Sequence, residues 1–212
     1  GHAPLYLFVR QFMIPPHTFN GKTGEYEVEI PRIIAPHCKQ IVELWDDPKL
    51  RKSESDDTVY PLSVNIVQWN GAEIQPWQSG TLQYIISNPQ AISHRLESFL
   101  GYLSSQEMQY IFDDAENDDI AAELSLRESD AYKKVFSVCG LTILDYPYLD
   151  FALYTIELSY AYNEEHMLSV LMHKNKLISH GGVTDFMFRG NAILEHAAMS
   201  MGIHEIAYDK IV

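Results

Sequence analysis

The C-terminal third of the chain constrains the fold more than any other part. Leu141–Leu144 is a short apolar run, and residues 152–161 alternate between apolar and polar side chains. Such alternation is typical of a strand with one buried face. Residues 167–173 form another apolar run, and Lys174–Asn175 predicts a tight turn before a return strand at Leu177–Ile178. These short, sequential runs predict an antiparallel β-meander.

The middle of the chain predicts a β-hairpin followed by a helix. Asn70–Gly71 stands between Leu62–Ile66 and Ala72–Ile74. An Asn-Gly pair between alternating runs is a strong hairpin signal, because both turn residues must adopt positive φ. Apolar residues spaced along one helical face then predict a helix over residues 89–103, with Asn88 as its N-cap.

Capping and stop signals predict further helices. Ser104 and Glu107 have capping-box spacing, so a second helix is expected to begin there. Residues 129–138 have a helical pattern, and Gly140 is placed to end that helix. A last helix is expected over residues 191–202. The predicted fold class is α+β, with an antiparallel meander and hairpins packed against several helices, rather than a doubly wound sheet.

The N-terminal part predicts an extension to this domain. Residues 1–50 are expected to hold strands and a short helix, and Tyr26–Ile30 alternates as a strand that ends at Pro31. Residues 46–58 are polar and lack apolar periodicity, which indicates an exposed connection. We therefore expect an α+β domain over residues 59–212, with one continuous domain as the alternative.

The net charge of the chain limits the classes of partner that we expect it to bind. The 212 residues include 15 Lys and Arg against 29 Asp and Glu, a formal net charge of −14. Nucleic-acid binding needs a cationic surface, so DNA and RNA are not expected as partners. No run of about 18 apolar residues is present, so no membrane partner is expected either.

The two cysteines, Cys38 and Cys139, lie in apolar stretches and are expected to be buried free thiols. Low cysteine content favours a cytoplasmic location.

The densest group of chemically active side chains follows the alternating segment. It comprises Glu164, Glu165, His166, His173 and His180, with Asp185 nearby. A carboxylate beside an imidazole is typical of a general acid–base pair or of a metal-ligand set. The spacing differs from the His-Glu-x-x-His arrangement of zinc helices, and turn hydrogen bonds and strand-end capping are the structural alternative. No catalytic, cofactor-binding or metal-binding residue, and no cofactor, is assigned from this pattern.

Two smaller features are interpreted as structural. Ser179–Gly182 (Ser-His-Gly-Gly) is expected to be a turn after a strand, because the glycine motifs of dinucleotide, phosphate and hydrolase sites are absent. The tyrosines near the meander are expected to fill the sheet core, since residues 141–163 contain no Lys or Arg to flank a nucleic-acid stacking platform. They are Tyr146, Tyr148, Tyr154, Tyr160 and Tyr162.

Residues 156–182 resemble a family of bacterial domains of unknown function. The family signature is a strand that ends in Trp-Asp-Glu-Glu-His-Gly-Leu-Gly-Val, followed by a hairpin and a Gly-Gly pair. Residues 162–170 read Tyr-Asn-Glu-Glu-His-Met-Leu-Ser-Val, so Glu-Glu-His is kept while Trp-Asp and the two glycines are replaced. The helix over residues 89–103 also fits the family layout, which extends the resemblance over residues 59–190. The resemblance implies an immunity protein against a polymorphic toxin, and it carries over no catalytic residue.

Three functions follow as hypotheses. The first is a non-enzymatic protein-binding module, in particular an immunity-type protein that neutralises a cationic toxin. An acidic surface would steer such a partner towards the chain. The alternative is a metal-dependent hydrolase that uses the cluster of Glu164, Glu165 and His166. A second alternative is a structural subunit that self-associates through an exposed hairpin.

Overall fold

The strands predicted between residues 141 and 182 form four of the seven strands of one sheet. The computed structural model describes residues 17–20, 25–31, 33–35, 61–68, 73–106, 136–160, 167–182 and 185–186. The strands are β1 (His17–Asn20), β2 (Glu25–Ile30), β3 (Leu62–Val67), β4 (Phe136–Tyr148), β5 (Phe151–Tyr160), β6 (Leu168–His173) and β7 (Lys176–Gly182). The helices are α1 (Pro76–Ser87) and α2 (Pro89–Gln106).

The strands lie in the sheet in the order in which they occur in the sequence. Every neighbouring pair is antiparallel except β3 and β4, which are parallel. A parallel pair needs a crossover, and here the chain crosses through α1 and α2. The predicted meander is confirmed for β4 to β7. The fold is a mixed α and β structure dominated by a mostly antiparallel sheet.

The strand predicted at residues 26–30 is confirmed as β2. Both β1 and β2 come from the segment predicted as an N-terminal extension. Residues of β2 pair with β3 from Glu25 opposite Val67 to Ile30 opposite Leu62. The N-terminal strands therefore belong to the same sheet as the rest of the described chain.

The hairpin predicted around Asn70–Gly71 is wrong, because residue 74 is not in a strand and α1 begins at Pro76. Proline suits the first turn of a helix, because the N–H groups there have no acceptor within the helix and the missing N–H of proline is not needed. The buried side chain of Gln78 fixes this start. Its Oε1 accepts the backbone N–H of Gln75 at 3.0 Å, and its Nε2 donates to the carbonyl of Val67 at 2.7 Å. The same side chain thus caps α1 and joins it to β3.

The helix predicted over residues 89–103 is confirmed as α2. Asn88 stands at the expected junction, but its side-chain amide donates to the carbonyl of Tyr84 and so closes α1. The helix continues through residues 104–106, so a new helix does not begin at Ser104. One stripe of α2 is buried against the sheet, as its spacing predicted. The stripe consists of Ile92, Leu96, Phe99, Leu100 and Leu103.

Two local predictions around β4 and β7 are wrong. Residues 136–138 are strand rather than helix, and Gly140 lies within β4 at a β-bulge that follows Val138. The bulge leaves Cys139 exposed, whereas a buried thiol was expected. Ser179–Gly182 is the end of β7 and not a turn.

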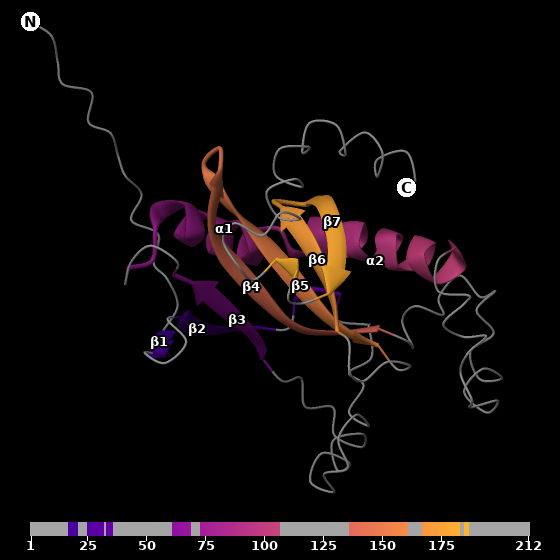
Figure 1. The fold of residues 1–212 in the computed structure, drawn as a ribbon, viewed down its shortest axis with the longest axis horizontal. Coiled ribbons are helices and arrows are strands. Elements are labelled where there is room, and N and C mark those ends of the chain that lie inside the picture. Colours follow the sequence, from indigo (N-terminus) through magenta and orange to yellow (C-terminus); the bar gives the residue numbers. More distant parts are fainter. Residues whose placement is uncertain are drawn as a thin grey trace, which may run out of the picture.

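The two faces of the sheet differ in what they bury. Figure 1 shows α1 and α2 in line across one face. Alternate strand residues on that face form the main core with the helices, including Val64, Leu141, Ile156 and Val170. On the opposite face, Leu144, Leu153, Leu171, Ile178 and Phe186 form a second, smaller cluster. Tyr154 is fully buried in the main core, and Tyr146 and Tyr148 pack on the second cluster, as expected for core tyrosines.

Several predicted segments lie outside the described residues. These are the connection at 46–58, residues 129–135 and the helix at 191–202. Cys38, Tyr162 and the whole interval from 107 to 135 are also outside them. Among the described residues, no helix combines the length and apolar character needed to cross a membrane.

We predict that Gln78→Ala lowers the free energy of unfolding by about 1–3 kcal/mol, because it leaves the buried carbonyl of Val67 without its donor. Urea denaturation followed by circular dichroism measures this. Gln83→Ala is the control, because the side chain of Gln83 donates to Ser87 at the exposed surface, and this change should alter stability by no more than about 0.5 kcal/mol. Equal losses in both variants would contradict the role of Gln78.

Candidate functional site

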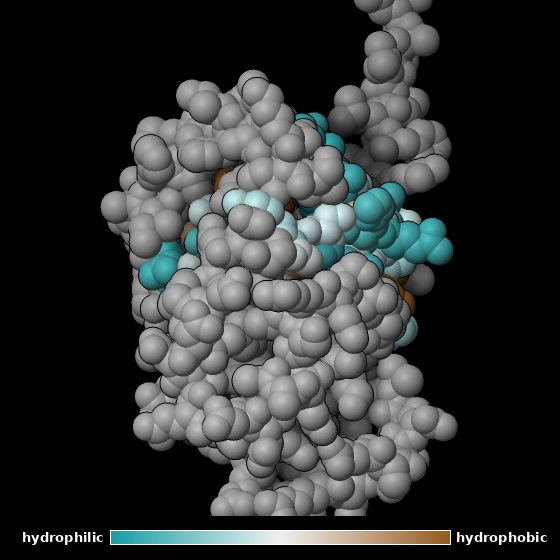
Figure 2. Space-filling view, turned by 90° about the vertical axis from the view of Figure 1, so that its right-hand side faces the viewer, coloured by the Kyte–Doolittle hydropathy of each residue, from teal (hydrophilic) through white to brown (hydrophobic). Residues whose placement is uncertain are grey.

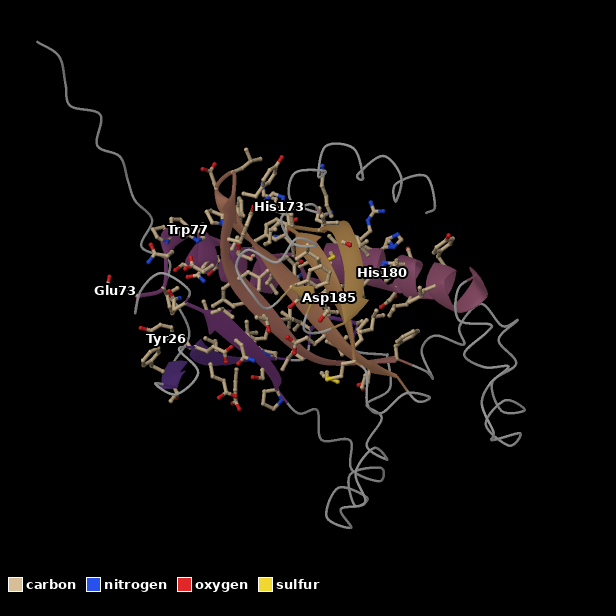
Figure 3. The ribbon with its side chains drawn as sticks, in the orientation of Figure 1. Tyr26, Glu73, Trp77, His173, His180 and Asp185 are labelled. Atoms are coloured by element: carbon tan, nitrogen blue, oxygen red, sulfur yellow. The ribbon has the colours of Figure 1, made fainter. Side chains whose placement is uncertain are left out.

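The residues predicted as a functional cluster are only partly within the described chain. Glu164, Glu165 and His166 lie outside it. His173 ends β6 and His180 lies in β7, and Figure 3 shows them in separate places. The Nε2 of His173 lies 3.2 Å from the carbonyl oxygen of Tyr148, which can only accept, so this nitrogen donates. The ring of His180 lies 5.1 Å from that of Phe99 on α2.

A β-bulge places the two histidines on opposite faces of the sheet. His173 pairs with Lys176, and a regular hairpin would bring residue 180 to the same face as His173. The register shifts by one residue after Leu171, so His180 pairs with Val170 and faces the helices. The described residues contain no group of three or more His, Cys, Asp or Glu side chains arranged to hold a metal ion. His173 and His180 therefore act in different surroundings.

Asp185 approaches the end of β7. Its Oδ2 accepts the backbone N–H of Gly182 at 2.8 Å. A Cβ added at Gly181 would lie 2.5 Å from the same oxygen, so a residue with a side chain would displace Asp185. The Gly-Gly pair thus admits a carboxylate close to the backbone, which is a local structural role.

The face opposite the helices carries polar residues in rows across the strands. The register places Ser63, Gly140, Glu157 and Ser169 side by side on β3 to β6, with Glu29 at one end and Gly181 at the other. The adjacent row holds Glu27, Asn65, Thr142 and Thr155. We call these two rows the polar face.

Carboxylates gather at the β2 side of the polar face. Glu25, Glu27 and Glu29 alternate along β2 and therefore point to the same side. The hydroxyl of Ser63 donates to Oε1 of Glu27 at 3.2 Å, which draws that carboxylate towards β3. We call these three residues together with Glu157 the acidic stripe. Strands β1 to β5 contain no Lys or Arg.

Glu157 is the most perturbed member of the acidic stripe. Its carboxylate leans over Gly140, where an added Cβ would lie 3.3 Å from Oε2. The hydroxyl of Thr142 donates to its Oε1. Burial raises the pKa of Glu157 above the usual value; the Thr142 hydrogen bond lowers it in part, and the negative charge of Glu25 raises it. Strands β1 to β5 contain no Lys or Arg that could stabilise the ionised carboxylate of Glu157.

Ser169 lies beside Glu157 in the register and is 1% exposed. Its hydroxyl oxygen is buried and makes no hydrogen bond in the structure. An unsatisfied buried hydroxyl is costly, and it is uncommon in folded proteins. The polar face therefore contains a partly buried carboxylate with a raised pKa beside a buried hydroxyl that makes no hydrogen bond in the structure.

The acidic stripe was not predicted from the sequence. The alternation of Glu25, Glu27 and Glu29 was visible and predicted a strand, and the same period places the three carboxylates on one face. Glu157 was visible as a polar position in an apolar strand. Its neighbours Thr142 and Gly140 are distant in the sequence, so only the register brings them together.

Comparison of the chain with protein-family models, with curated proteins and with solved structures finds no match.

We predict that the stability of the protein falls as pH rises from about 4 through the raised pKa of Glu157. The folded state binds this proton more tightly than the unfolded chain does, so ionisation favours unfolding. Glu157→Gln removes this penalty while an amide oxygen still accepts from Thr142. The variant should gain stability relative to the original chain between pH 4 and pH 7, measured by urea denaturation.

Thr142→Val gives the complementary test. It removes the donor to the ionised carboxylate, and at pH 7 it should cost about 1–3 kcal/mol, with a smaller loss near pH 4. A constant stability difference at both pH values in both variants would show that Glu157 does not titrate in this range.

Proposed function

We propose that the chain is a non-enzymatic binding domain that presents its acidic stripe to a basic protein partner. The observation that carries this proposal is the arrangement of Glu25, Glu27, Glu29 and Glu157 on one face of strands that contain no Lys or Arg. Such a face attracts a cationic surface and speeds its association.

The neighbours of the stripe support this proposal. Ser63 and Gly140 are small residues that lie between β2 and Glu157, and the carboxylates of Glu27 and Glu157 lean over them. The negative charge of Glu25 raises the pKa of Glu157, so the carboxylates of Glu25 and Glu157 repel each other in the free protein. A Lys or Arg side chain of a partner would relieve that repulsion and donate hydrogen bonds to the carboxylates of Glu25 and Glu157.

We propose an immunity-type role, in which the bound partner is a cationic toxin that the domain neutralises. The resemblance of residues 156–182 to a family with that implied role supports it, and Glu157 lies within this segment. The formal net charge of −14 supports a cationic partner as well. The low cysteine content supports a cytoplasmic site of action.

Of the alternatives, the metal-dependent hydrolase gains no ligand set from the residues that the structure describes. Glu164, Glu165 and His166 lie outside those residues, so this function remains a hypothesis on the sequence pattern. Self-association through an exposed hairpin likewise remains a hypothesis.

We predict that replacing Glu27 and Glu29 by Gln weakens binding of a fluorescein-labelled decalysine peptide by about 3- to 10-fold at low salt, because the steering charge is lost. Fluorescence anisotropy measures the affinity. The difference between the original chain and the variant should shrink as the salt concentration rises towards 0.5 M, since exposed charges are then screened.

The control variant carries Glu73→Gln and Glu97→Gln. It removes the same number of charges from positions outside the polar face. It should lose less than half as much affinity as the stripe variant. If both double variants weaken binding equally, net charge alone attracts the peptide and the acidic stripe is not the binding face.

A further inference from the structure

A cavity of about 630 Å³ lies between α1 and the turn that joins β4 to β5. Its position is independent of the polar face, because α1 covers the other side of the sheet. Three aromatic side chains line it: Trp77 and Tyr84 from α1, and Phe151 from the start of β5. Figure 3 shows Trp77 at the end of the molecule where α1 begins. A volume of this size falls within the range of small-molecule sites.

The aromatic rings form walls at an angle to each other. The rings of Tyr84 and Phe151 lie 5.8 Å apart with an interplanar angle of 74°. The pKa of Tyr84 is raised, because burial outweighs its hydrogen bond to the backbone of Asn175. Asn175 lies in the β6–β7 turn. Two rings in this edge-to-face arrangement form an aromatic corner of the cavity.

The cavity is lined by an acidic residue and, among the described residues, by no basic one. Among the described residues that line it, Asp150 alone carries a charge. The ammonium of Lys174 lies 4.3 Å from the centroid of the Phe151 ring, although Lys174 does not line the cavity. This contact shows that the Phe151 ring already accepts an ammonium group on one face. A carboxylate beside aromatic rings suits a cation better than a neutral or anionic ligand.

Gly80 keeps the cavity open at a cost to α1. Glycine inside a helix is unfavourable relative to alanine. A Cβ added at Gly80 would lie 3.8 Å from the carbonyl oxygen of Asp150 and 3.9 Å from the Phe151 ring, which are ordinary contacts. Packing therefore does not require glycine here, and a larger side chain at this position would project into the cavity.

Leu149 adds an apolar rim. It is 78% exposed and occupies the turn with a φ of 53°, a region that glycine adopts more readily than leucine. A bulky apolar side chain held out in a strained turn contributes nothing to the core. At the mouth of the cavity it offers a contact for the apolar part of a ligand.

We propose that this cavity binds a small organic cation, a quaternary or tertiary ammonium with an apolar body. The ammonium lies against the rings of Trp77, Tyr84 and Phe151, with Asp150 as its counter-charge. The apolar body lies against Leu149 and over Gly80. This site is separate from the acidic stripe, so it stands whether or not the stripe binds a basic protein.

Isothermal titration calorimetry of the full chain with choline tests the proposal. Its neutral carbon isostere, 3,3-dimethylbutan-1-ol, serves as the matched ligand. Choline should bind about tenfold more tightly than the alcohol, because the rings and Asp150 favour the charge. Asp150→Asn should remove most of this preference. Lys174→Asn should strengthen choline binding, since it removes a positive charge close to the Phe151 ring.

Gly80→Leu locates the site. It should abolish choline binding while the thermal melting temperature stays the same or rises, because leucine is the better helix former. Gly101→Leu makes the same change in α2, outside the cavity lining, and should leave binding intact. Equal binding of choline and the alcohol would reduce the cavity to a plain apolar pocket and overturn the proposal. Undiminished binding in a folded Gly80→Leu variant, or no binding by the original chain, would overturn it as well.

Discussion

The parallel pairing of β3 with β4 determines the rest of this fold. Parallel neighbours cannot be joined by a tight turn, so the chain must leave the sheet after Val67 and return at Phe136. The two helices of that crossover cover one face, and their apolar stripes make it the main core. The side chain of Gln78 links α1, the first of these helices, to β3, the strand that precedes it in the chain.

In Figure 2, which faces the right-hand side of Figure 1, the described residues that reach the surface are mainly hydrophilic.

This crossover also separates two kinds of chemistry. On the helix side, the contact between α1 and the β4–β5 turn forms an aromatic cavity. On the other side, residues of the same strands alternate outwards as the polar face. Glu157 and Ile156 are neighbours in β5, yet one faces carboxylates and the other the apolar core. One strand therefore serves both the core and the candidate binding face.

The strands of the meander were predictable because each buries one face. Apolar and polar residues therefore alternate along the sequence, which is the pattern that indicates a strand. The helix α1 was not, since Thr81, Ile85 and Ile86 favour strands and the preceding Asn-Gly pair signalled a hairpin. Contacts far along the chain stabilise it instead, such as the backbone N–H of Ala152 donating to Thr81 at 2.8 Å. The helix and strand propensities of single residues do not reflect such long-range contacts.

Register explains the remaining differences. The spacing of His173 and His180 allowed a meeting across the hairpin, and a single extra residue in β7 separates them. Likewise, nothing in the spacing of Gly140 and Thr142 reveals that both adjoin Glu157. Bulges depend on the packing of whole strands, so single-sequence patterns do not locate them. Candidate sites on this sheet are therefore harder to predict than its strands.

Some of the residues that break the local rules of protein structure lie at the cavity, and others lie on the polar face. At the cavity are a glycine inside a helix, a leucine with positive φ and the buried indole N–H of Trp77, which has no acceptor in the structure. On the polar face are the carboxylate of Glu157 and the unsatisfied hydroxyl of Ser169. Each of these features lowers the stability of the folded protein. Natural proteins keep such costs where binding requires them, which is why we place ligand and partner at these two positions.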